Sequence, residues 1–123
     1  MILIDYKDSR PIYEQIVDKF RLLILNGVLK ADEKMPSVRT LAMELSINPN
    51  TIQRSYGELE RQGYIYTVKG RGNFVSDTAE LKNEYRREIF ERLDGVINAA
   101  GNAGITKDEL IEHIKGVDSN DKD

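Results

Sequence analysis

Two helical patterns in the middle of the chain are separated by a break of only four residues, 46–49. Apolar side chains recur at helical spacing on both sides of this break: Val38, Leu41, Ala42 and Leu45 before it, and Ile52, Tyr56 and Leu59 after it. Ser37 is a suitable N-cap for the first helix, and Pro49 suits the first turn of the second. Two helices joined this tightly predict a helix-turn-helix unit.

An earlier helix is expected over residues 10–26. Ser9 is its expected N-cap, Pro11 is tolerated in the first turn, and Gly27 is the expected stop. Its apolar face comprises Ile12, Ile16, Val17, Phe20, Leu23 and Ile24. This face can cover the apolar sides of the two central helices.

Beyond Gly63 the pattern changes from helix to strand. Aromatic and β-branched residues predict strands over 64–68 and 73–76, and the glycines of residues 69–72 permit a tight turn between them. The order helix, short helix, turn, helix and hairpin predicts a winged helix-turn-helix, a mainly α fold with one small β-hairpin.

The remaining residues, from 79 onwards, are expected to form two helices. A long helix over 80–100 carries an apolar stripe nearly half its circumference wide, more than a lone helix can leave in water. The stripe comprises Leu81, Tyr85, Ile89, Phe90, Leu93, Val96, Ile97 and Ala100. The last helix can cover part of it, and the surface expected to remain is that of Leu81, Tyr85, Ile89, Phe90, Leu93 and Ile97. Residues 101–104 predict a turn, and Thr106 with Glu109 predicts a capping box. The last helix is expected to face inward with Leu110, Ile111, Ile114 and Val117, before a polar, frayed tail.

Charge divides the chain at the same place. The net charge is −3 overall, but +1 over residues 1–78 and −4 over residues 79–123. The overall balance argues against a protein that coats nucleic acid or an anionic membrane by bulk charge. No acidic residue occurs between Glu44 and Glu58, and such a window suits a surface that faces phosphates. We therefore expect two regions, a winged helix-turn-helix over 1–78 and a short helical dimerisation region over 79–123.

Composition excludes several other classes of protein. The chain has no cysteine, so disulfides, thiolate zinc sites and a cysteine nucleophile are excluded. One histidine, His113, leaves little room for a metal cluster, and no partner pattern near it indicates catalysis. Neither a membrane-spanning run nor a signal peptide is expected. The sequence thus predicts a cytoplasmic protein that is not an enzyme, with no metal and no cofactor.

The outward face of the helix after the break suits nucleic acid. It carries Asn50, Gln53, Arg54, Gly57 and Arg61. Asn and Gln can pair with adenine, and Arg can pair with guanine or grip phosphate. An ordinary solvated face is the alternative for these polar residues. Gly57 either allows a DNA backbone to come close or reflects drift at an exposed position.

Basic residues outside this helix are further candidates for DNA contacts. Lys69 and Arg71 flank Gly70 at the hairpin tip, where they can enter the minor groove or bracket a phosphate. A solvated, charged turn is the alternative. Arg39 is expected at the groove edge, with a surface ion pair as its alternative.

The motifs together resemble the GntR family of bacterial transcription regulators. The run Met35-Pro36-Ser37-Val38-Arg39-Thr40-Leu41-Ala42 is similar to its Leu-Pro-Ser-x-Arg-x-Leu-Ala signature, with Met35 in place of the commoner leucine. The pattern continues through Asn48-Pro49-Asn50-Thr51 and Gly70-x-Gly72-x-Phe74-Val75. The resemblance implies DNA contacts at Arg39, Asn48, Asn50, Thr51, Gln53, Lys69 and Gly70. With the residues derived above, the expected DNA-binding set is Ser37, Arg39, Asn48, Asn50, Thr51, Gln53, Arg54, Lys69, Gly70 and Arg71.

The short region after residue 78 resembles that of the YtrA subfamily, in which a helical tail serves dimerisation. This implies a homodimeric repressor of a transporter-type operon, and of its own gene, acting at a palindromic double-stranded operator. The expected dimer contacts are Leu81, Tyr85, Ile89, Phe90, Leu93 and Ile97. A winged helix that binds protein or RNA is the alternative, and an apolar or acidic outward face on the recognition helix would favour it.

Overall fold

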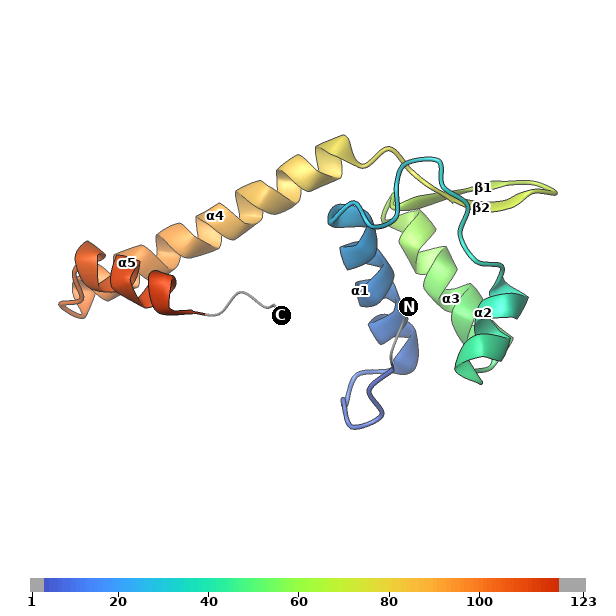
Figure 1. Cartoon of the computed structure of the whole chain (residues 1–123), viewed down its shortest axis with the longest axis horizontal. Helices are drawn as coiled ribbons and strands as arrows, with labels where there is room; N and C mark the ends of the chain where they lie inside the picture. Colours follow the sequence, from blue (N-terminus) through green and yellow to red (C-terminus); the bar gives the residue numbers. More distant parts are fainter. Residues whose placement is uncertain (1–3, 118–123) are drawn as a thin grey trace. The chain divides into compact units, whose positions relative to one another are not determined.

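The computed structural model describes residues 4–117 of the chain. Its elements follow the order α1 (Ile12–Leu25), α2 (Val38–Leu45), α3 (Pro49–Arg61), β1 (Ile65–Val68), β2 (Gly72–Val75), α4 (Ala79–Asn102) and α5 (Lys107–Gly116) (Figure 1). This order confirms the predicted fold class. Contacts divide the chain into two compact units, one ending at Ala79 and the other beginning at Glu80.

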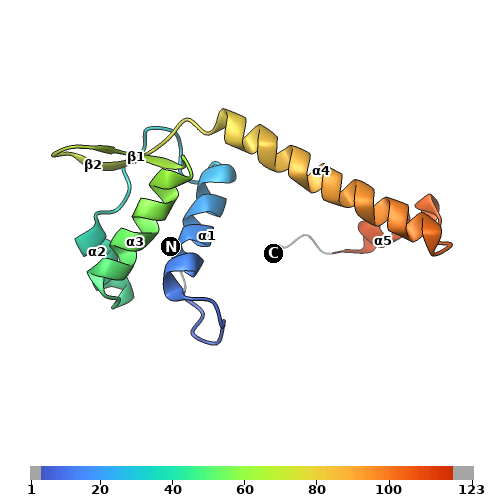
Figure 2. The ribbon, with the colours of Figure 1, turned by 180° about the vertical axis from the view of Figure 1, so that it is seen from behind.

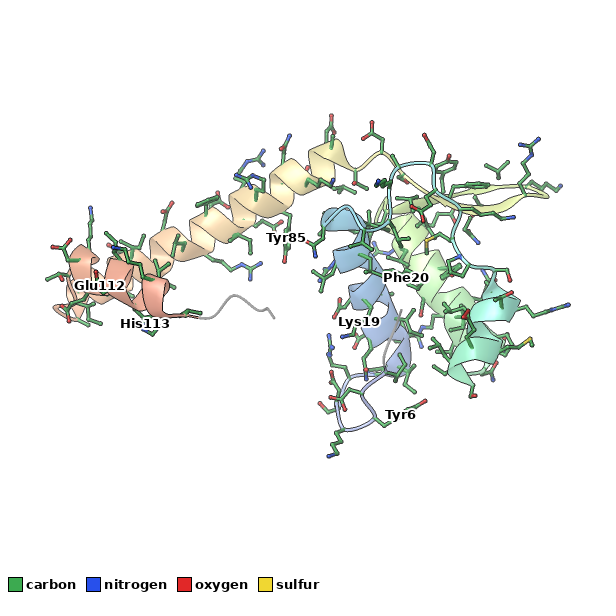
Figure 3. The ribbon with its side chains drawn as sticks, in the orientation of Figure 1. Tyr6, Lys19, Phe20, Tyr85, Glu112 and His113 are labelled. Atoms are coloured by element: carbon green, nitrogen blue, oxygen red, sulfur yellow. The ribbon has the colours of Figure 1, made fainter. Side chains whose placement is uncertain are left out.

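The core of the first unit lies between α1 and α3. Opposite views show α1, α3 and α2 side by side, with the hairpin at one end of α3 (Figures 1 and 2). Phe20 of α1 (Figure 3) meets Tyr56 of α3 edge to face, with 5.8 Å between the ring centroids. The largest fully buried apolar side chains around this pair are Ile16, Ile24, Ile52, Leu59, Ile65 and Val75. Their burial confirms the apolar faces predicted for both helices.

Side-chain caps form the tight junction of α2 and α3. Ser37 accepts a hydrogen bond from the Thr40 amide at 3.0 Å, and Asn48 accepts one from the Asn50 amide at 2.8 Å. Between the helices Ser46 takes a left-handed conformation, with φ of 55°. The predicted helix-turn-helix is confirmed.

The predicted cap of α1 is wrong. The helix begins at Ile12 with Pro11 as its N-cap, and no side chain caps it. Instead the buried side chain of Gln15 holds the preceding segment. Its amide donates to the Asp5 and Arg10 carbonyls, and its oxygen accepts from the Asp5 amide at 3.0 Å. Ser9 lacks the capping role because proline already fixes the entry to the helix, and Gln15 anchors the chain from within the first turn.

The hairpin pairs Ile65 with Val75 at its base and Val68 with Gly72 near its tip. Gly70 has φ of 80°, a conformation that glycine adopts without strain, so the turn can be as short as residues 69–71. The loop before α2 adds main-chain bonds to β2. The Asp32 amide donates to the Val75 carbonyl at 2.7 Å, and the Met35 amide to the Asn73 carbonyl at 2.8 Å. The wing is therefore bonded to the segment that leads into α2.

The second unit contains most of α4 and all of α5. The turn predicted over 101–104 is wrong in part, because α4 continues through Asn102. Two residues after the helix, Gly104 takes φ of 80°, and the Ile105 amide donates back to the Ala100 carbonyl at 2.8 Å. This turn with a left-handed glycine provides hydrogen bonds for the last carbonyls of the helix. The helix therefore ends two residues later than expected.

Thr106 and Glu109 form the predicted capping box at the start of α5. The inward orientation expected for its apolar residues is confirmed only in part. Leu110 is half-buried and faces α4 together with Ile111 and Ile114. Ile111, Ile114 and Val117 nevertheless remain 48%, 61% and 59% exposed, because α4 covers only one side of a short helix. The predicted tail lies outside the described residues. Within residues 4–117, no helix has the length and apolar character needed to cross a bilayer.

Candidate nucleic-acid interface

Helix α3 separates its side chains cleanly into a buried and an exposed face. Its buried residues are Ile52, Ser55, Tyr56 and Leu59. Asn50, Gln53, Arg54 and Gly57 are all exposed, as the helical spacing predicts. At Gly57 an added Cβ would meet no atom within 4 Å, so nothing within the chain requires glycine there.

Two buried hydroxyls fix the orientation of α3. The Tyr56 hydroxyl donates to the Pro36 carbonyl at 2.7 Å, which ties α3 to the start of α2. The Ser55 hydroxyl lies 3.0 Å from the Tyr13 carbonyl of α1. Burial, with a smaller effect of Glu44, raises the pKa of Tyr56 well above its ordinary value, so the ring stays neutral and keeps donating. The exposed face of α3 is therefore held on a rigid support.

Among the described residues, the cations expected to contact DNA form no ion pair with an acidic side chain. Within residues 4–117, Arg39, Arg54, Lys69 and Arg71 form no ion pair, which removes the surface-pair alternative for Arg39. Arg61 differs from them, since its Nε donates to Glu58 at 2.8 Å.

Hydrogen bonds from Arg61 and then Gln62 lower the pKa of Glu58 to about 2, so this carboxylate is ionised at neutral pH. Arg61 is therefore engaged within the chain, whereas the four unpaired cations remain available for phosphates.

The remaining predicted site residues also lie on α2, α3 or the hairpin. Ser37 and Asn48 use side-chain oxygens as helix caps. The Asn48 amide group makes no hydrogen bond among the described residues, and Thr51 is half-buried on the first turns of α3. Lys69, Gly70 and Arg71 are exposed at the hairpin tip. The structure thus places the whole predicted set on the first unit.

One contact at this face escapes sequence reasoning. The guanidinium carbon of Arg54 lies 3.7 Å from the centroid of the Tyr13 ring. Tyr13 belongs to α1, and only the packing of α1 against α3 brings the two residues together. Helical spacing within either helix gives no signal for this contact.

The second unit carries a large apolar surface. On α4, Ile89, Phe90 and Leu93 are 40%, 54% and 37% exposed, and Tyr85 projects from the helix flank (Figure 3). Leu81, Tyr85 and Ile97 are half-buried. An apolar groove of about 420 Å³ runs between α4 and α5, lined by Leu93, Val96, Ile97, Lys107, Leu110, Ile111, His113 and Ile114. Few isolated helical hairpins leave such a surface in water.

Residues 12–75 match the family described as "Bacterial regulatory proteins, gntR family". The chain belongs to this family. The chain is similar along nearly its full length to the HTH-type transcriptional repressor YtrA of Bacillus subtilis, with 42% identity over 99% of this chain and 95% of the relative. The family makes the chain a DNA-binding transcription regulator, not an enzyme.

Two solved structures are similar to this chain. A GntR family transcriptional regulator from Listeria monocytogenes superposes with a TM-score of 0.71 at 38% identity, over 90% of this chain and 98% of that one. The DNA-binding domain of AraR in complex with operator ORX1 matches 62% of this chain and 95% of that one, at 29% identity and a TM-score of 0.55.

Proposed function

We propose that this gntR-family regulator is a cytoplasmic homodimeric repressor that binds a palindromic operator through residues 1–78 and dimerises through residues 79–123. The observation that carries the proposal is that one chain has two exposed surfaces of different chemistry, one on each unit. The first unit has an exposed amide and guanidinium face beside unpaired wing cations, and the second has an unpartnered apolar face.

On the DNA side, α3 is the recognition helix. Asn50, Gln53 and Arg54 reach base edges in the major groove, where amides pair with adenine and guanidinium with guanine. Lys69 and Arg71 on the wing contact the backbone, and Arg39 grips a phosphate at the groove edge. Ser37 and Asn48 cap α2 and α3 and so fix the first turns of both helices, from which these contacts are made.

On the dimer side, the stripe of α4 meets the same stripe of a second chain. A two-fold pair presents two recognition helices to half-sites about one helical turn apart. Val96 of the stripe and Ile111 line the groove between α4 and α5, which gives the partner a recess to fill. The same surface thereby sets the spacing of the two DNA contacts.

The likeness to the repressor YtrA supports repression over activation. The resemblance to its subfamily supports a transporter-type operon, and the chain's own gene, as targets. Of these targets, the chain's own gene is the one that the following experiment tests.

The test is footprinting on the region upstream of the chain's own gene, followed by gel shift of the protected segment with a salt titration. We expect one protected palindrome, bound by two chains, with affinity that falls steeply as salt rises. A duplex with one half-site scrambled is the matched control. Protection of no segment, or binding of one chain per site, would overturn the proposal.

A further inference from the structure

The contact between Arg54 and Tyr13 has a specific geometry. Arg54 is exposed on α3, and its guanidinium lies over the half-buried Tyr13 ring of α1 at 3.7 Å. Within residues 4–117 the Arg54 side chain makes no hydrogen bond and no ion pair. The flat face of the guanidinium is therefore covered, while its N–H groups are unpaired.

The backbone of Tyr13, whose ring covers Arg54, is hydrogen-bonded to α3. The Tyr13 carbonyl accepts from the hydroxyl of Ser55, the residue next to Arg54 on α3. Ser55 is fully buried and also donates toward the Thr51 carbonyl at 3.0 Å. Neighbouring residues of α3 therefore contact the backbone and the ring of Tyr13, so α1 is bonded to α3 at the place where the ring meets the guanidinium.

Beside the stacked pair the surface is open. A hollow of about 430 Å³ lies against the first turns of α1 and α3, lined by Pro11, Ile12, Tyr13, Asn50, Thr51 and Arg54. Asn50 belongs to the proposed base-reading set, so the free edge of Arg54 lies on the surface that would face DNA.

We propose that Tyr13 is a positioning residue, whose ring holds the Arg54 guanidinium in the orientation in which Arg54 contacts DNA. A long arginine side chain ordinarily loses much rotamer freedom when it binds, and stacking on a fixed ring removes part of that loss beforehand. Stacking leaves the planar N–H edge free for a bidentate contact with guanine or phosphate. This inference rests on the proposed function, in which residues 1–78 bind operator DNA.

The test is a double-mutant cycle on the duplex that the wild-type chain selects from a randomised library. Tyr13→Leu removes the aromatic face, Tyr13→Phe removes only the hydroxyl, and Arg54→Ala removes the cation. We expect Tyr13→Leu to weaken binding about threefold to tenfold in the wild-type background and not at all in the Arg54→Ala background. Tyr13→Phe should bind like the wild type.

Equal losses from Tyr13→Leu in both backgrounds would overturn the inference, because they would indicate a structural or independent role. A loss in Tyr13→Phe that matches Tyr13→Leu would also overturn it, because the hydroxyl and not the ring would then act.

A second readout needs no DNA. In the free protein, ring current from Tyr13 should shift the Arg54 side-chain protons upfield, in wild type and in Tyr13→Phe but not in Tyr13→Leu. Absence of the shift in wild type would overturn the inference even if Tyr13→Leu fails to fold. If the wild-type chain enriches no duplex, the proposed function is wrong, and this inference, which rests on it, is wrong as well. Wild-type binding with equal losses in both backgrounds overturns this inference alone.

Discussion

Replacing Leu93 by aspartate should separate the two chains of the dimer while leaving the DNA-binding unit folded. Leu93 lies on the α4 stripe and lines the groove, and it is 37% exposed in the single chain. Fully burying a leucine stabilises by ~1.5–3 kcal/mol, so the exposed third has about 0.5–1 kcal/mol to gain per chain. The aspartate that replaces it weakens association by a further ~1–3 kcal/mol per chain, because its carboxylate would be buried without a hydrogen-bond partner.

A two-fold interface contains the substitution twice, so the total loss of association free energy is about 3–8 kcal/mol. This loss corresponds to at least ~100-fold weaker association. Asn98→Asp is the matched control, because it adds the same charge to the opposite, polar side of α4.

Sedimentation velocity over a concentration series measures the association directly. We expect wild type and Asn98→Asp to sediment as dimers at micromolar concentration, and Leu93→Asp as a monomer with most of its operator affinity lost. Helical content and the melting of the first unit should be unchanged. Wild type that sediments as a monomer, or Leu93→Asp with wild-type association, would refute the placement of the interface.

Four further substitutions test the first unit. Asn50→Ala and Gln53→Ala should each cost ~1–3 kcal/mol of specific binding and relax base preference at one position, as read by competition with singly altered duplexes; unchanged selectivity in both would contradict direct readout. Lys69→Ala should weaken binding to all sequences alike and flatten the salt slope by ~1 unit, and a changed base preference at constant slope would assign the wing another role. Gly57→Ala should raise the free energy of unfolding by up to ~1 kcal/mol in urea titration, because alanine is the better helix former and the added methyl meets open space; an unchanged midpoint would count against that account.

The fold was predictable because its junctions are local. Ser37, Pro49 and Gly63 mark helix ends through their own backbone and side-chain chemistry, and the structure has helix ends at those places. Where two local signals competed, prediction failed. Ser9 resembles a cap, but Pro11 two residues later sets the entry to α1, and Gly101 resembles a stop, but Gly104 takes the left-handed conformation.

The candidate site was predictable in its membership but not in its interactions. Helical spacing places Gln53 and Arg54 outward without knowledge of the fold. The engagement of Arg61 by Glu58 depends on rotamers within one helix, and the stack of Arg54 on Tyr13 depends on how α1 crosses α3. Sequence spacing carries no signal for a contact between residues so far apart in the chain.

The loop between α1 and α2 is constrained in length and, at one position, in residue type. Its bonds to β2 use the amides of Asp32 and Met35 and the carbonyl of Glu33, whereas the side chains of residues 30–34 are exposed. Asp32 has φ of 67°, and its carboxylate accepts a hydrogen bond from the Tyr66 hydroxyl at 2.7 Å. Proline or a β-branched residue is therefore disfavoured at position 32, because proline cannot donate and both are strained at positive φ. Insertion or deletion of a single residue would shift the start of α2 relative to the hairpin to which this loop is bonded. We therefore expect functional variants to keep the number of residues in this loop and a residue that tolerates positive φ at position 32, while the other exposed side chains vary.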